Sequence, residues 1–251
     1  MGSNRTKLAW MSPKRVPSRR LTDRIPFLGD HVDALSALWD LPAEGAESDR
    51  AVLLAHGAGA PMDTPLLEWA AQSLAEAGVP VLRFLYPYTE RARREERRLP
   101  PDRAPVLLAS HRAAAQVLRG RFPDARWIFG GKSMGGRMSS MLAAEGDALH
   151  ALFFLGYPLH PAGKPERERS EHFGAIELPA LFLQGDRDAL CELPLLESAL
   201  QRFSGDAHLH VVRGADHGFD VRKRDGRTPD DVRQELRTEL LAWLDRALPP
   251  G

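Results

Sequence analysis

A serine between two glycines is the residue of this chain best suited to covalent chemistry. Ser133 is the centre of a G-x-S-x-G pattern, GKSMG at 131–135. An apolar run at 126–129 precedes the pattern, and a stretch with helical spacing at 134–145 follows it. This is the arrangement of a nucleophile elbow, a sharp strand-to-helix turn that presents a hydroxyl to a substrate carbonyl. Ser133 is therefore our candidate nucleophile.

The same pattern also occurs in two other kinds of site. Ser133 could simply cap the following helix, which is a common duty for serine. The sequence GKS at 131–133 also imitates the end of a phosphate-binding loop, but that motif needs a glycine where this chain has Arg126. The pattern alone thus leaves a catalytic nucleophile and a helix cap as alternatives.

A serine hydroxyl becomes a strong nucleophile when a base takes its proton, and the base is usually a histidine oriented by a carboxylate. Two downstream residues fit this need. Asp188 follows a predicted strand at 179–184, and His217 follows one at 207–212. Because the carboxyl ends of parallel strands share one edge of a sheet, we expect Ser133, Asp188 and His217 to converge there. The order of the three is that of a serine, acid and histidine triad.

Alternatives remain for the acid and for the base. Asp186 precedes Asp188 by two residues and is the fallback acid, although it could instead cap its own turn. Asp216, next to His217, is expected to be structural. His217 itself could be a surface histidine of a loop.

The loop after a strand at 51–55 reads HGAGAPMDT, at 56–64. An anionic tetrahedral intermediate needs hydrogen-bond donors, usually the N–H after the nucleophile and one from this loop. We therefore expect the backbone N–H groups of Met134 and Ala58 to form an oxyanion hole, with His56 bracing the loop. The glycines here do not indicate a dinucleotide site, because Met62 stands in place of the third glycine and Arg83 in place of the acidic residue.

Short apolar runs alternate with helical patterns along the chain, which predicts a mostly parallel sheet with helices on both faces. About seven strands are expected, at 34–39, 51–55, 79–85, 126–129, 150–155, 179–184 and 207–212, the first of them at an edge of the sheet. Helices are expected at 64–77, 104–118, 134–145, 193–202 and 229–248.

Two insertions, 86–103 and 157–173, follow predicted strands at the edge where ligands bind in such sheets. Tyr86, Tyr157 and His160 stand at or near the starts of these insertions and are candidates for lining a pocket. The first insertion is rich in arginine and in acidic residues, which indicates a solvated helix with ion pairs rather than an anion site.

The composition of the chain limits the kinds of partner that we expect. The 251 residues are 43% hydrophobic, and 34 Lys and Arg balance 34 Asp and Glu, so we expect a small-molecule substrate and no nucleic-acid or membrane partner. The apolar runs are too short to span a bilayer. A single cysteine, Cys191, favours the cytoplasm. We expect a disordered basic tail at 1–24 and one domain at 25–251.

Several sequence blocks resemble a known family, the small α/β-hydrolase-like proteins related to dienelactone hydrolases. They are HGAGA at 56–60, RFLYPY at 83–88, GGKSMGGR at 130–137, GYPLHP at 156–161, GDRD at 185–188 and GADH at 214–217. The family includes bacterial hydrolases, animal testis-expressed proteins and histone-acetyltransferase subunits. The resemblance implies an α/β-hydrolase fold with a minimal lid and a triad. Dienelactone hydrolases proper carry cysteine at the nucleophile, so their lactone substrate is not carried over to Ser133.

These observations predict a serine hydrolase that cleaves an ester or related acyl bond and needs neither metal nor cofactor. The alternative is an interaction module that has kept the hydrolase fold without its activity, because a fold does not fix a function. Thioester or amide cleavage and acyl transfer use the same residues, and pocket shape decides among them.

Overall fold

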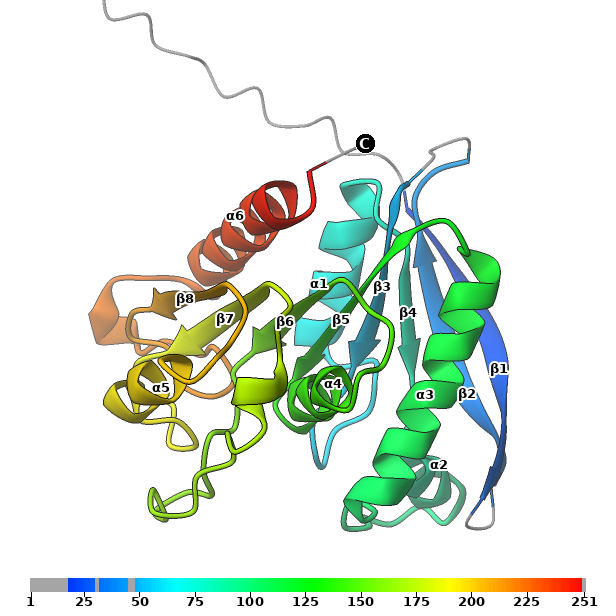
Figure 1. The fold of residues 1–251 in the computed structure, drawn as a ribbon, viewed down its shortest axis with the longest axis horizontal. Coiled ribbons are helices and arrows are strands. Elements are labelled where there is room, and N and C mark those ends of the chain that lie inside the picture. The colour runs from blue at the N-terminus through cyan, green and yellow to red at the C-terminus, as the bar shows by residue number, and fades with distance from the viewer. Residues whose placement is uncertain (1–17, 30–31, 45–47, 250–251) are drawn as a thin grey trace, which may run out of the picture.

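A mixed sheet forms the centre of the molecule (Figure 1). The computed structural model describes residues 18–29, 32–44 and 48–249. Within them eight strands lie in the order β1-β2-β4-β3-β5-β6-β7-β8. The strands are β1 (Arg19–Gly29), β2 (Val32–Leu41), β3 (Arg50–Ala55), β4 (Val81–Phe84), β5 (Arg126–Lys132), β6 (Ala151–Leu155), β7 (Ala180–Gly185) and β8 (Ala207–Val212). The helices are α1 (Pro65–Glu76), α2 (Pro87–Arg94), α3 (Ala104–Arg121), α4 (Met134–Ala144), α5 (Leu193–Leu200) and α6 (Pro229–Ala247), with short 3₁₀ turns at Phe173–Ala175 and Lys223–Asp225.

The predicted fold class is confirmed, and the sheet has one strand, β1, that was not predicted. The six strands β3 to β8 are parallel to one another. β2 pairs antiparallel with both β1 and β4. β1 occupies the edge that we expected the segment at 34–39 to hold. Residues 19–24 of β1 fall in the segment expected to be a tail, and residues 1–17 lie outside the described residues. Because β1 is an exposed edge strand, charged residues interrupt its apolar pattern and hide it from sequence reasoning.

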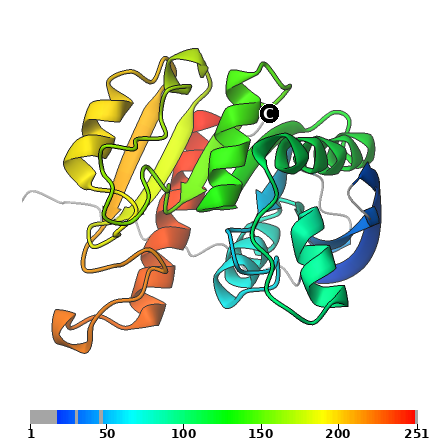
Figure 2. The ribbon, with the colours of Figure 1, turned by 90° about the horizontal axis from the view of Figure 1, so that it is seen from below.

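Helices cover both faces of the sheet (Figure 2). Side chains of the strands alternate between two cores, one on each face. Leu53 and Ala55 of β3 pack into the core beneath α3, α4 and α5. Val52 and Leu54 of the same strand pack into the core beneath α1 and α6. This two-sided burial explains why the parallel strands read as continuous apolar runs.

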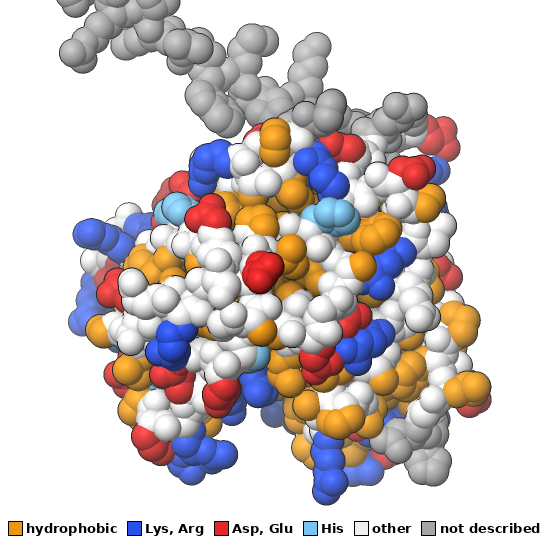
Figure 3. Space-filling view, in the orientation of Figure 1, with side chains coloured by type: hydrophobic (Ala, Val, Ile, Leu, Met, Phe, Trp, Pro, Cys, Tyr) orange, Lys and Arg blue, Asp and Glu red, His pale blue; other side chains and the backbone are white. Residues whose placement is uncertain are grey.

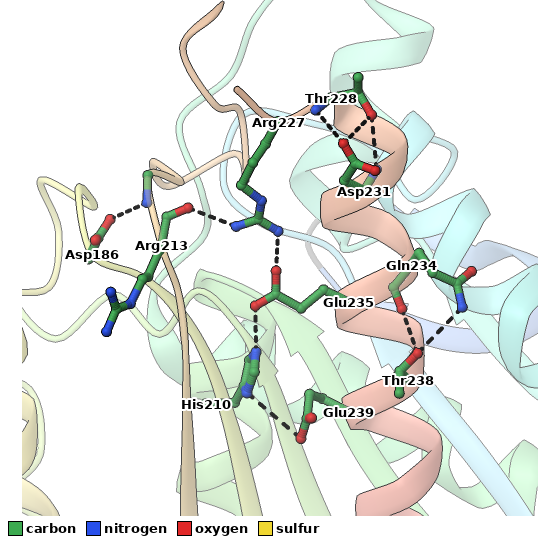
Figure 4. Close-up of polar contacts among 11 residues, drawn as sticks. Asp186, His210, Arg213, Arg227, Thr228, Asp231, Gln234, Glu235, Thr238 and Glu239 are labelled. Atoms are coloured by element: carbon green, nitrogen blue, oxygen red, sulfur yellow. Dashed lines mark hydrogen bonds and ion pairs between the residues drawn. The ribbon is translucent and has the colours of Figure 1, made fainter. Parts of the chain in front are cut away.

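Polar contacts fix α6 against the last strand (Figure 4). His210 on β8 contacts Glu235 of α6 at 2.8 Å and Glu239 at 3.7 Å. Arg227 pairs with Glu235 and also donates to the carbonyl of Arg213, at 2.9 Å. The turn that follows β8 is thereby held in place at both of its ends.

A buried ion pair braces the loop that follows β3. Arg83 on β4 is fully buried and donates to Asp40 of β2 at 2.9 and 2.7 Å and to the carbonyl of Met62 at 2.6 Å. Asp40 also accepts from Arg20 at 2.9 Å. Arg83, which stands where a dinucleotide site would have an acidic residue, thus has a structural role.

Changing Asp40 to asparagine is expected to destabilise the protein by about 3 kcal/mol or more, because it leaves the Arg83 charge buried without a counter-charge. Denaturant unfolding would measure the loss. Glu44→Gln removes an exposed pair with Arg19, at 3.1 Å, and is the control. It should cost less than about 0.5 kcal/mol. Equal losses in the two variants would contradict the role given to Asp40.

The surface carries both signs of charge. Figure 3 shows Lys and Arg side chains interspersed with Asp and Glu over the face in view. In the described part of the chain, no helix is long and apolar enough to cross a membrane.

Candidate active site

Ser133 occupies the sharp turn that its sequence pattern predicts, between β5 and α4. Its backbone has a φ of 51° and a ψ of −118°, which is a strained conformation for a residue with a side chain. The two flanking glycines are required by close contacts. A Cβ at Gly131 would lie 2.4 Å from the nitrogen of Gly136, and a Cβ at Gly135 would lie 2.5 Å from the carbonyl oxygen of Ala55. The turn can therefore form only with glycine at both positions.

Asp188 and His217 are in direct contact. The Nδ1 of His217 lies 2.6 Å from Oδ2 of Asp188. The Asp188 side chain is fully buried, whereas that of His217 is 28% exposed. Asp188 also accepts from Nε2 of Gln184 at 2.6 Å and from the N–H of Leu190 at 2.8 Å. A carboxylate held by these donors keeps the proton on Nδ1 of His217 and leaves Nε2 as an acceptor.

His217 lies over the end of β6, between Asp188 and the strand that carries Ser133. A Cβ added to Gly156, which has a φ of 70°, would lie 3.4 Å from Nδ1 of His217. The same Cβ would lie 3.0 Å from Nζ of Lys132. Glycine at 156 therefore leaves room for the imidazole at the edge of the sheet where Ser133 stands.

Lys132 ties the strand of Ser133 to the loop of His217. Its Nζ donates to the carbonyl of His217 at 2.5 Å and lies 5.9 Å from the ring centre of Phe219. Burial lowers the pKa of Lys132 to about 8, although Asp188 and Asp216 oppose this shift. Sequence reasoning gave Lys132 no role, and its position beside the candidate nucleophile was the only signal.

Replacing Lys132 by methionine is expected to change how stability depends on pH. Below pH 8 the lysine is protonated in both the folded and the unfolded chain. Between a pKa of about 8 in the folded chain and the ordinary 10.5, only the unfolded chain holds the proton. The free energy of unfolding of the unchanged protein should therefore rise over this window relative to that of Lys132→Met. Denaturant unfolding at about pH 7 and about pH 10 would measure this.

The exposed Lys164 supplies the control, because Lys164→Met removes a lysine charge from the surface. This variant should keep the rise. A Lys132→Met variant that also kept it would show that the Lys132 ammonium is not buried as described.

His56 braces the loop after β3. Its Nδ1 donates to the carbonyl of Gly57 at 2.8 Å, and its Nε2 accepts from the N–H of Tyr86 at 3.1 Å. Burial lowers the pKa of His56 to about 4, so the ring is neutral at pH 7. Gly57 approaches Ser133 closely, since a Cβ on it would lie 3.4 Å from Cβ of Ser133.

The two expected oxyanion donors, Met134 and Ala58, belong to segments that adjoin Ser133. Ala58 is exposed and directly follows Gly57. Met134 begins α4, where the N–H groups of the first turn have no partner within the helix. The oxyanion hole formed by these two N–H groups stays a prediction.

The three expected pocket residues are buried, and their polar atoms have partners inside the protein. Tyr86 and Tyr157 are 0% exposed and His160 is 1% exposed. The Tyr86 hydroxyl lies 3.0 Å from Nδ1 of His111, and the Tyr157 hydroxyl donates to the carbonyl of Arg169 at 2.9 Å. Nε2 of His160 accepts from the N–H of Glu192 at 3.1 Å. These side chains hold loops together, which is the duty that a buried polar group usually has.

The other two aspartates of these loops bond to backbone. Oδ1 of Asp186 accepts from the N–H of Gly214 at 2.8 Å (Figure 4). Oδ1 of Asp216 accepts from the N–H groups of Gly218 at 2.8 Å and Asp220 at 3.0 Å. Asp188 is thus the aspartate that the structure brings to His217. Gln184, which donates to Asp188 and accepts from the N–H of Tyr157 at 2.8 Å, was missed, although a polar residue ending an apolar strand was a usable signal.

Residues 48–245 match a family described as alpha/beta hydrolase domain. Among solved structures, a dienelactone hydrolase from Anabaena variabilis has 20% identity and a TM-score of 0.70 over 92% of this chain and 99% of that one. An α/β serine hydrolase without a lid from Xanthomonas campestris has 20% identity and a TM-score of 0.68, over 94% and 98%. A Pyrococcus furiosus esterase has 16% identity and a TM-score of 0.69, over 95% and 94%. These structures share the fold of this chain.

Proposed function

The chain belongs to the alpha/beta hydrolase domain family, and from this premise we propose that it is a serine hydrolase that cleaves an ester or related acyl bond. Ser133 is the proposed nucleophile, His217 the base and Asp188 the residue that orients the base. The proposed substrate is a small acyl compound. Family membership gives the fold, and the proposal for activity depends on the site.

One observation carries the proposal. A buried carboxylate, Asp188, lies 2.6 Å from Nδ1 of His217, which leaves Nε2 of His217 as an acceptor. We infer that this Nε2 accepts the proton of Ser133. This is the relation of acid to base on which nucleophilic serine depends. A serine that only capped a helix would not require a contact between Asp188 and His217.

The proposed reaction has two halves. His217 Nε2 takes the proton of the Ser133 hydroxyl as the oxygen attacks the substrate carbonyl, and the N–H groups of Met134 and Ala58 bind the resulting oxyanion. His217 then gives its proton to the leaving group as the bond to the acyl carbon breaks. In the second half His217 removes a proton from water, which attacks the acyl-serine. His217 returns this proton to the Ser133 oxygen as the bond to the acyl carbon breaks, and the acid is released.

Labelling with a fluorophosphonate probe tests the proposal. An activated serine displaces fluoride from phosphorus and becomes covalently marked. We expect labelling of the unchanged protein, and none of Ser133→Ala or His217→Ala. Ser204→Ala alters an exposed serine whose hydroxyl donates to the carbonyl of Gly174 at 2.7 Å, and it should be labelled normally. A folded protein that resists labelling would favour the interaction module instead.

A further inference from the structure

A pocket of about 410 Å³ lies between the loop after β3 and α2. Its lining includes Gly59, Pro61, Tyr88, Ala92 and Leu99, together with charged side chains of α2 and of the segment that follows it. Its volume falls within the range of about 300–1,000 Å³ that is usual for small-molecule sites. None of the residues described so far as candidate catalytic groups lines it.

The chemistry of the pocket suits an uncharged group. Pro61, Ala92 and Leu99 give it an apolar lining. Arg93 pairs with Asp63 at 2.7 Å, and Arg97 pairs with Glu95 at 2.7 Å. Acidic partners offset these two guanidinium groups, and Arg98 shares the lining with Glu96. Because the lining carries both signs of charge, its apolar side chains favour an uncharged group.

The pocket begins close to Ser133. Gly57 packs against the nucleophile, and Gly59, two residues further on, lines the pocket. Two residues of extended chain span at most about 7 Å. The Tyr88 hydroxyl in the pocket wall donates to the carbonyl of Gly57 at 3.4 Å, which ties the wall to the loop beside Ser133.

The order of the strands determines which part of a substrate can enter. β5 carries Ser133 at its end, β7 and β8 carry Asp188 and His217 on one side, and β3 and β4 lead to the pocket on the other. Figures 1 and 2 show α2 near the β1 end of the sheet and the loop after β8 near the opposite end. The leaving group must receive its proton from His217, so it lies on the β8 side. The acyl chain then extends toward α2.

We propose that this pocket binds the apolar acyl chain of the substrate, so that the enzyme prefers esters of medium-length, uncharged acids to acetate esters. The inference rests on the proposed function. In this inference the acyl chain of the substrate contacts Pro61, Tyr88, Ala92 and Leu99, which are residues of the pocket lining.

Filling the pocket tests the inference. The substrates are p-nitrophenyl acetate and p-nitrophenyl octanoate, and the measured quantity is the octanoate-to-acetate ratio of kcat/KM. Ala92→Phe is expected to lower this ratio about tenfold, which is at the low end of the effect of one misfitting group in an apolar pocket. Leu99→Ala enlarges the same pocket and is expected to shift the preferred acyl chain to a longer one.

Two comparisons separate the possible outcomes. Ala162→Phe makes the same change at an exposed position in the insertion after β6, and the ratio should stay as in the unchanged protein. Octyl acetate carries its long chain on the alcohol, so Ala92→Phe should not affect it more than it affects p-nitrophenyl acetate. A ratio unchanged by Ala92→Phe, or a loss confined to octyl acetate, would overturn the inference while leaving Ser133-dependent hydrolysis intact. Absence of any Ser133-dependent hydrolysis would overturn the proposed function, and the inference with it.

Discussion

Ser133→Ala is expected to lower kcat/KM for an ester on the order of 10⁴-fold or more, because it removes the oxygen that we propose forms the acyl intermediate. Turnover that remains would come from the oxyanion donors and from binding alone. The strained backbone at Ser133 belongs to the turn and not to the hydroxyl, so the fold should survive the change. The measurement is steady-state hydrolysis of p-nitrophenyl butyrate beside a denaturant unfolding curve.

Two results would count against this prediction. Full esterase activity in Ser133→Ala would show that another residue performs the attack. Loss of activity together with a large loss of stability would show only that the turn had been disturbed. Ser204→Ala, an exposed serine in the turn before β8, should match the unchanged protein in both measurements.

Much of the fold could be predicted because its signals are local. The parallel strands are buried on both faces and stand out as short apolar runs between helical patterns. The Ser133 turn is visible in sequence because steric contacts at Gly131 and Gly135 exclude every other residue. β1 was not visible, since an edge strand with one solvated face can carry charges such as Arg20 and Arg24.

The site was harder to predict wherever long-range contacts decide it. Strand order brings Asp188 to His217 across 29 residues, and the chain order of the two suggested this. Lys132 reaches the carbonyl of His217 across 85 residues, and no local pattern indicates such a contact. Tyr86 and Tyr157 look like pocket residues because aromatic groups begin each insertion. In the structure both are buried, and their hydroxyls have partners inside the protein. Neither lines the pocket beside α2, whose wall includes another buried tyrosine, Tyr88.

Asp188→Asn is expected to lower kcat/KM about 10⁴-fold, whereas Asp186→Asn should have a small effect. The asparagine at 188 can present its amide N–H to Nδ1 of His217, which favours the tautomer that carries its proton on Nε2 and cannot act as a base. At 186 the asparagine oxygen can still accept from the N–H of Gly214, so the turn keeps its hydrogen bond. The two variants make the same chemical change two residues apart.

The ranking of the two variants carries the argument, since both remove one negative charge from the same loop. A general electrostatic effect of that loop would reduce both rates to a similar extent. Only a specific contact with the imidazole, such as the 2.6 Å hydrogen bond of Asp188, separates them by several orders of magnitude. The reverse ranking would assign the acid to Asp186 and would require the turn at 185–188 to rearrange. Fluorophosphonate labelling should follow the same order, because it depends on the same activated serine and needs no knowledge of the natural substrate.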